Sequence, residues 1–282
     1  MFFSSLISAV TGAAAKMLSD DMSALEIVFF RNLFGMIFIV AALKHTPSKL
    51  KGGKPMLLLW RGIFGFSALL LFFYTITSIP LGEAITLNKT SPLFVTVLAF
   101  FILHQRLSYI GIFALICGFF GVALITKPLG LQIGFAHFLG LLGGFFAAAA
   151  YTTIGKIKHI YDSRMIVLSF MTTGVVAPLL LFAVASFYTN EALGFMLTPF
   201  VTPTSFGVWS LLLLIGTTAT LSQWLLTKAY SSTNAAVIGV VSYINIPFAI
   251  LFGTFLGDKI PDFYTVLGIT LIVISGILVK KG

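Results

Sequence analysis

Hydrophobic residues in this chain form long, nearly unbroken runs that are separated by short polar stretches. Most of the runs are about 17–24 residues long, and a helix needs about 20 apolar residues to cross the hydrocarbon core of a bilayer. The runs are Phe2–Leu18, Leu25–Leu43, Met56–Ile76, Glu83–Leu103, Tyr109–Thr126, Phe138–Ile154, Met165–Tyr188, Phe206–Leu226, Ala235–Leu256 and Tyr264–Val279. A membrane-spanning β-barrel would show short alternating segments instead. The pattern predicts an all-α integral membrane protein of about ten transmembrane helices.

Composition indicates the same fold class. Of the 282 residues, 59% are hydrophobic and 9% are charged, whereas a soluble domain has about 25% charged residues. The connections between the runs are short and leave no room for a soluble domain. The single cysteine, Cys117, lies within a run and has no partner for a disulfide or a thiolate metal site.

The distribution of charge predicts the orientation in the membrane. With a cytoplasmic N-terminus, the inner side receives most of the 17 basic residues, namely Lys44, Lys49, Lys51, Lys54, Arg61, Arg106, Lys156, Lys158, Arg164, Lys228, Lys280 and Lys281. Inner loops of membrane proteins carry such an excess of Lys and Arg. We therefore expect a multi-pass protein of the inner membrane with both termini in the cytoplasm. The net charge of +9 then reflects topology, and no nucleic-acid partner is needed to explain it.

An internal repeat divides the chain into two halves. Ala9–Lys16 aligns with Ala149–Lys156, and Ser91–Phe94 aligns with Ile246–Ala249. We expect one five-helix repeat in residues 1–127 and a second in residues 137–282. Because five is an odd number, the second repeat would enter the membrane in the opposite direction. Inverted repeats of this kind place a substrate site near the middle of the bilayer, between the halves.

Short motifs recur in order along both halves. The first half carries Leu59-Trp60-Arg61-Gly62, Leu81-Gly82-Glu83-Ala84, Thr90-Ser91-Pro92-Leu93-Phe94 and Gly121-Val122. The second half carries Gln223, Thr227-Lys228-Ala229-Tyr230, Ala235-Ala236, Tyr243, Pro247-Phe248-Ala249, Gly257-Asp258 and Gly268 to Gly276. In this order the motifs resemble those of EamA-type transporters in the drug/metabolite transporter superfamily.

The resemblance implies a ten-helix, two-repeat carrier that moves amino-acid-like or nucleotide-like metabolites, or drugs, by alternating access. Such carriers are often coupled to an ion gradient, so a coupling ion is a possible partner. The Thr-Ser-Pro and Gln…Thr-x-Ala-Tyr pattern is similar to that of carriers proposed for S-adenosylmethionine-like metabolites. Two positions depart from the family pattern, since His104-Gln105 replaces a Gly-Glu pair and Asp258 replaces a Glu.

Lys89 is the first candidate for substrate binding. A charged side chain in the middle of a transmembrane segment is costly, so it normally faces a cavity and has a partner. Its neighbours Asn88 and Ser91 are polar, and Pro92 removes a backbone donor. Either Lys89 attracts a carboxylate or phosphate of the substrate, or it forms a structural ion pair with Glu26 or Glu83.

The second half offers a matching set of candidates. Ser242, Tyr243 and Asn245 should oppose the Asn88–Pro92 segment by pseudo-symmetry, and Ser242 and Asn245 would share a helix face. Hydrogen bonding between helices is the alternative role. Gln223 and Trp224 lie deep in the eighth run. Trp224 would either stack on a ligand or pack in the core.

Arg31 completes the candidate set. It lies within the second run, five residues after Glu26, with which it would form a structural pair if it does not bind substrate.

Enzyme chemistry finds little support in the sequence. The four histidines lie near predicted loops without metal-ligand spacing, and no two embedded carboxylates are placed for acid–base work. We therefore expect no catalytic residues, no metal and no cofactor. The alternatives to a secondary transporter are a membrane-embedded transferase and a channel. The expected partners are a small-molecule substrate and membrane lipid, and the protein would be a monomer or a homodimer.

Overall fold

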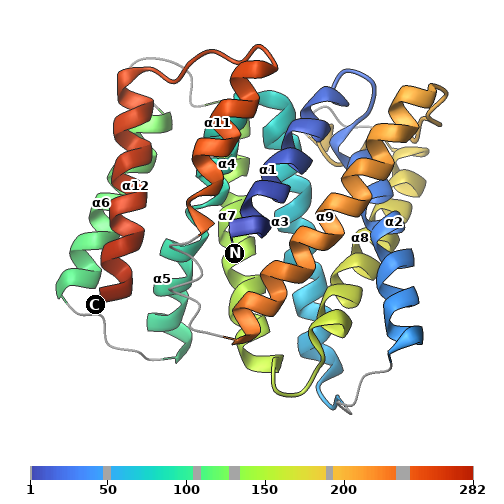
Figure 1. Ribbon diagram of the computed structural model, residues 1–282, viewed down its shortest axis with the longest axis horizontal. Helices are drawn as coiled ribbons and strands as arrows, with labels where there is room; N and C mark the ends of the chain where they lie inside the picture. Colours follow the sequence, from blue (N-terminus) through green and yellow to red (C-terminus); the bar gives the residue numbers. More distant parts are fainter. Residues whose placement is uncertain are drawn as a thin grey trace.

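The computed structural model describes residues 2–46, 52–103, 109–126, 134–188, 193–232 and 242–281, and these ranges contain helices and no strand. The first-half helices are α1 (Phe2–Met17), α2 (Ala24–His45), α3 (Pro55–Ser78), α4 (Leu81–Asn88), α5 (Ser91–Leu103) and α6 (Tyr109–Thr126). The second-half helices are α7 (Phe135–Ile157), α8 (Ser163–Ala185), α9 (Phe206–Ser232), α11 (Asn245–Phe255) and α12 (Phe263–Lys281), as shown in Figure 1. The all-α prediction is confirmed.

Five of the described helices are long and apolar enough to cross a membrane. They are α2, α3, α7, α8 and α9, each with at least 22 residues. Together with the family relationships reported below, they make this a multi-pass membrane protein. The total of ten spans and their division into two repeats stay predictions.

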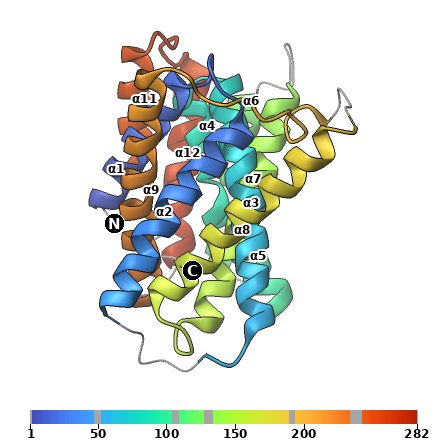
Figure 2. The same cartoon turned by 90° about the vertical axis from the view of Figure 1, so that its right-hand side faces the viewer.

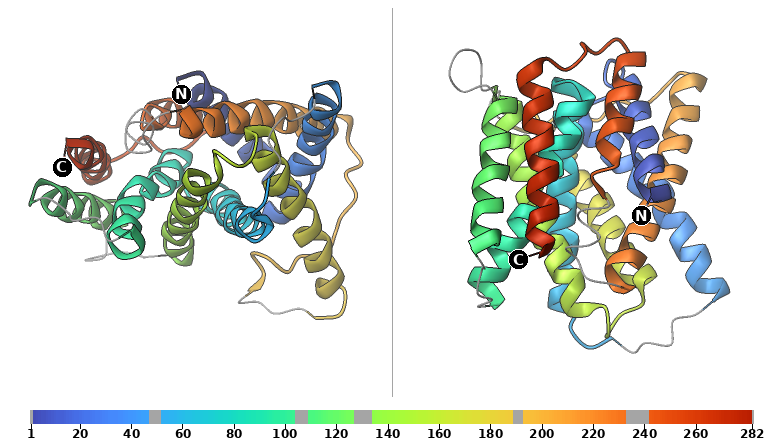
Figure 3. Two further views of the ribbon diagram at one scale, coloured as in Figure 1. Left: turned by 90° about the horizontal axis from the view of Figure 1, so that it is seen from below. Right: turned by 60° about the vertical axis from the view of Figure 1, so that its left-hand side comes forward.

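Helices from the two halves of the chain are interleaved. Figures 1 and 2 show α3 beside α7 and α2 beside α8, while α1 lies along α9. The α6–α12 pair stands at one side of the bundle, as both views in Figure 3 show. A Cβ atom on Gly121 would lie 2.7 Å from the carbonyl oxygen of Gly268, so the backbones of α6 and α12 are in close contact there. Small residues permit such close approach between membrane helices.

The fourth apolar run is broken into α4 and α5, which differs from a single continuous span. At the end of α4, the Lys89 amide donates to the Ile85 carbonyl at 2.9 Å. At the start of α5, the Thr90 carbonyl accepts from the Leu93 amide at 2.9 Å. Pro92 sits in the first turn of α5, where a missing N–H costs least. Gly144 of α7 faces this break, because a Cβ there would meet the Thr90 hydroxyl and the Leu87 carbonyl at 2.6 and 3.0 Å.

One end of the bundle, at the bottom of Figure 1, is formed by the α2–α3 and α7–α8 connections. The Gly52 amide donates to the Ile160 carbonyl at 3.2 Å, and the Tyr161 hydroxyl accepts from the amides of Gly53 and Lys54. Gly52 has φ +76°, which favours glycine. These contacts bring the residues before α3, with Lys54, together with the α7–α8 connection, with Lys158, at one end, called the lower end below.

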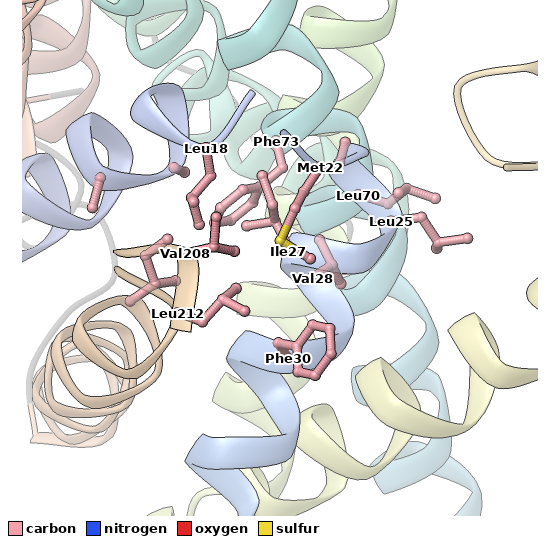
Figure 4. Close-up of a cluster of buried hydrophobic side chains, with 14 of the residues drawn as sticks. Leu18, Met22, Leu25, Ile27, Val28, Phe30, Leu70, Phe73, Val208 and Leu212 are labelled. Atoms are coloured by element: carbon pink, nitrogen blue, oxygen red, sulfur yellow. The ribbon is translucent and has the colours of Figure 1, made fainter. Parts of the chain in front are cut away.

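The opposite, upper end is packed by an apolar cluster from α1, α2, α3 and α9. Figure 4 shows Leu18, Val28, Phe73 and Leu212 among its members, each 1% exposed or less. At the start of α2, Ser23 and Glu26 form a capping box, and Glu26 Oε1 also accepts from the Val201 amide at 2.7 Å. The upper end is therefore tightly packed.

Candidate functional site

A cavity of about 110 Å³ with a mixed polar and apolar lining lies in the centre of the bundle. It is lined by helices of both halves, with Ser8, Thr11, Gly12, Arg31, Arg61, Gly65, Ala68, Leu69, Phe72, Phe73, Ile85, Asn88, Lys89, Ala147, Ala150, Tyr151, Phe170, Ala219, Ser222, Gln223, Leu226 and Asn245. Five of the nine predicted site residues are among them, namely Arg31, Asn88, Lys89, Gln223 and Asn245.

Two arginines meet on one aromatic ring in this cavity. The guanidinium carbons of Arg31 and Arg61 lie 5.4 and 5.0 Å from the ring centroid of Phe170, which is a cation–π distance. Arg31 donates from Nη1 to the Asn32 side chain at 2.9 Å. Nε and Nη1 of Arg61 are buried and find no hydrogen-bond acceptor in the described part of the chain. The pair leaves guanidinium donors unsatisfied beside the cavity.

Gly65 makes room for the Arg61 guanidinium. It follows Arg61 by one helical turn on α3, and a Cβ there would collide with Arg61 Nη1 and lie 2.6 Å from Cδ2 of Phe170. No larger residue fits without moving one of these groups. The absence of a side chain at Gly65 therefore directs Arg61 over Phe170 and into the cavity.

Lys89 lies at the break between α4 and α5 and is 9% exposed. Neither predicted ion-pair partner contacts it, because Glu26 caps α2 and Glu83 Oε2 lies 3.6 Å from His137 Nε2. The proposed Arg31–Glu26 pair is wrong for the same reason. Asn245 faces the same cavity from the first turn of α11, and its Oδ1 has no partner among the described residues.

The acidic residues that the structure describes leave the three cavity cations without a counter-charge. Four of them are engaged elsewhere: Glu26 and Glu83 as above, Asp258 with Lys16 at 2.5 Å, and Asp162 with Arg164 at 2.9 Å. Asp262 accepts from the Thr265 amide at 3.0 Å, and Asp20 and Asp21 are exposed. The eighth acidic residue, Glu191, falls outside the described ranges. In the described protein, Arg31, Arg61 and Lys89 thus line one cavity with no carboxylate.

The remaining wall of the cavity is neutral. Gln223 and Tyr151 face it, and the Tyr151 ring stacks on Tyr230 with centroids 4.7 Å apart. Ser222 exchanges hydrogen bonds with Ser4 of α1, at 2.9 and 2.8 Å to the two backbone carbonyls. These groups offer hydrogen bonds and an aromatic surface, but no charge.

Four predicted site residues lie elsewhere. Ser91 and Ser242 are buried outside the cavity lining. A turn at Tyr243 and Ile244 separates Ser242 from α11, so Ser242 and Asn245 do not continue one helix as predicted. The Tyr243 ring packs against Gly276 of α12, and together with Pro247 it borders an apolar groove.

Trp224 is the fourth of these residues. It lies on a different face of α9 from Gln223, with the Lys228 ammonium 5.4 Å from its ring. The chain is interrupted at the α4–α5 break and at the turn before α11. Asn88, Lys89 and Asn245 from these two segments line the cavity, whereas Pro92 and Pro247 lie outside its lining.

Arg61 was assigned above to the cytoplasmic charges, and this assignment is wrong. It lies inside α3, 1% exposed and in the cavity wall. Arg61 is the sixth residue of the apolar run Met56–Ile76 and is followed by Gly62 and Gly65, and this position was the available signal.

The upper end is closed between the halves by a polar contact. Lys16 of α1 pairs with Asp258, which follows α11, and Asp258 Oδ2 accepts from the Leu81 amide at 2.8 Å. Asp258, one of the two departures from the family pattern, thus bonds to two elements of the first half. His104-Gln105, the other departure, lies outside the described residues.

The chain is similar to known transporters over most of its length. The EamA-like transporter family matches residues 1–127. The pseudopaline exporter CntI of Pseudomonas aeruginosa is 32% identical over 96% of this chain and 91% of its own length. The S-adenosylmethionine uptake transporter of Rickettsia conorii is 25% identical over 95% and 88%, respectively. A solved crystal structure shares the fold with a TM-score of 0.67 at 16% identity, covering 99% of this chain and 95% of its own.

Proposed function

The chain belongs to the EamA-like transporter family, and from this premise we propose that it is a secondary active transporter of small anionic metabolites. The observation that carries the proposal is the central cavity, in which Arg31, Arg61 and Lys89 face no carboxylate of the described protein. Buried charges are costly unless they are paired. An anionic substrate would supply the missing counter-charge.

The pattern of helix contacts supports two repeats, residues 1–127 and 137–282. Each first-half helix has a counterpart in the second half: α1 corresponds to α7, α2 to α8, α3 to α9 and α6 to α12. Under this exchange the α3–α7 contact corresponds to the α9–α1 contact, and the α2–α9 contact to the α8–α3 contact. The α2–α8 and α6–α12 contacts map onto themselves. Such an exchange is what an internal two-fold relation produces, and inverted repeats use it to alternate access around a fixed site.

Two closures border the cavity and would open in turn. Toward the upper end stand the apolar cluster and the Lys16–Asp258 pair. Toward the lower end stands the Tyr151–Tyr230 stack, with Ile154, Ile157 and Ile166 around it. We assign the lower end, which carries the basic connections, to the cytoplasm of the inner membrane.

The names of the relatives suggest different cargoes, one exported and one taken up. The charge of the cavity favours an anion over S-adenosylmethionine, whose sulfonium is a cation and would face three further positive charges. An amino-acid-like or nucleotide-like substrate fits if it presents a carboxylate or phosphate to the arginines, because guanidinium groups bind both in a bidentate manner.

Counterflow in proteoliposomes tests the function. Vesicles preloaded with unlabelled glutamate, succinate, adenosine monophosphate or S-adenosylmethionine receive a trace of the same labelled compound outside. A carrier accumulates the label transiently above its equilibrium level, whereas a channel only equilibrates it. Lys89→Ala should abolish accumulation of the anions with an almost unchanged melting temperature. Lys44→Gln serves as the control, because Lys44 is an exposed cation in the last turn of α2, outside the cavity. Equilibration without accumulation, or chemical conversion of the probe, would instead indicate a channel or a transferase.

A further inference from the structure

We propose that the substrate carries at least two separate anionic groups, one held between Arg31 and Arg61 and the other at Lys89. This inference rests on the proposed transport function and narrows its substrate class to small organic dianions or larger polyanions. It follows from how the three cations are arranged around the cavity.

The arginine pair forms the first position. The guanidinium carbons of Arg31 and Arg61 lie 5.4 and 5.0 Å from the centre of the Phe170 ring, so one ring holds two like charges. Their repulsion disfavours this arrangement unless an anion contacts them. Arg61 keeps two buried N–H-bearing nitrogens without an acceptor in the described chain, and Gly65 leaves space for its guanidinium. Each of these nitrogens can donate a charge-assisted hydrogen bond to an oxygen of an anionic group.

Lys89 forms the second position, on a different element. It comes from the α4–α5 break, whereas the arginines come from α2 and α3. Its ammonium is a compact point charge that accepts many anion geometries. Asn88 and Asn245 face the cavity beside the two broken segments and can hydrogen-bond the same group. Among the described residues, the second half adds neutral groups to the lining, so the charges that bind the anionic groups of a substrate come from the first half.

Charge balance then decides the valence of the substrate. A single anionic group would neutralise one of three buried cations and leave two uncompensated. A second group, placed to reach Lys89 while the first is held by the arginines, removes most of this imbalance. A phosphate monoester carries two charges on one group, and it would satisfy the arginines but not Lys89.

Binding of size-matched anions to the purified full-length protein tests the proposal. The probes are butyrate, succinate and glycerol 3-phosphate, measured by calorimetry at fixed ionic strength. Succinate should bind at least ~10-fold more tightly than butyrate, the equivalent of one charge-assisted contact. Lys89→Gln should remove this advantage, Lys89→Arg should keep part of it, and Lys44→Gln should leave it unchanged.

Two outcomes would overturn the proposal. Equal affinities for butyrate and succinate would show that a second anionic group adds nothing. Glycerol 3-phosphate binding as tightly as succinate, with no loss in Lys89→Gln, would show that the charges need not be separate. The first of these outcomes, together with counterflow of both butyrate and succinate, would keep the transport of small anions and remove only this inference. Lys89-dependent succinate binding without counterflow would support the two positions and count against transport.

Discussion

The two halves of the chain contribute opposite kinds of chemistry to one cavity. The first half provides all three cations, from α2, α3 and the α4–α5 break. The second half provides Tyr151, Phe170, Gln223 and Asn245, none of which is charged at neutral pH. The helix contacts are nearly symmetric between the halves, while the side chains at the centre are not.

This difference separates two tasks that a carrier must perform. The proposed repeats would let the bundle open toward either side of the membrane, because the α3–α7, α2–α9, α2–α8 and α6–α12 contacts each have a counterpart. Binding of the substrate needs no such symmetry. Cations on one wall of the cavity orient an anion whose two ends differ. We therefore expect the cationic wall to set whether an anion binds at all, and the neutral wall to adjust which anion is preferred.

Among variants at positions other than Lys89, the largest effect should come from Arg61→Gln. Removing a charge-assisted contact to the anion should lower succinate counterflow on the order of 100-fold. The melting temperature should stay equal or rise, because the variant removes a buried cation that has no acidic partner in the described protein. Calorimetric binding and thermal unfolding of the same preparation check both parts. A variant that unfolds far below the wild type would instead make Arg61 a structural residue.

Gly65→Ala should have an intermediate effect through the same arginine. The added Cβ occupies space used by the Arg61 guanidinium and the Phe170 ring, so the guanidinium must shift. We expect about a 10-fold loss of counterflow, since small misplacements of a binding group are costly. In the double variant with Arg61→Gln, the loss should match that of Arg61→Gln alone, because both act through one group. Gly155→Ala is the matched control, because no atom lies near its added Cβ. Additive losses would contradict the assigned role of Gly65.

The fold class could be predicted from the sequence because lipid imposes a simple rule on composition. Runs of apolar residues near the thickness of the bilayer leave few alternatives to helices. The break in the fourth run was less visible. Pro92 marked it, but α4 ends at Asn88, four residues earlier, where α7 approaches through Gly144. Local sequence does not show which distant helix will press on a turn.

The candidate site was predicted in part, for a related reason. Lys89 and Arg31 stood out because a charge within an apolar run is costly wherever it points. Arg61 was missed because its run begins only a few residues earlier, so it resembled a charge at the membrane surface. Ser242, Tyr243 and Trp224 were placed by pseudo-symmetry or depth, and neither of these fixes the direction of a side chain around a helix. The cavity depends on that direction.

The smallest effect should come from the neutral wall, tested by Gln223→Ala. Gln223 faces the cavity from α9, opposite the cationic wall. Losing one neutral hydrogen bond costs about 1 kcal/mol, which corresponds to roughly a 5-fold weaker affinity. We therefore expect a rise in the apparent KM of counterflow for succinate and little change in its maximal rate. The ratio of succinate to butyrate affinity should stay as in the wild type, because the cations that read charge are untouched. A loss of that ratio in Gln223→Ala, as large as in Lys89→Gln, would mean that both walls sense charge and would remove the division of labour between the halves.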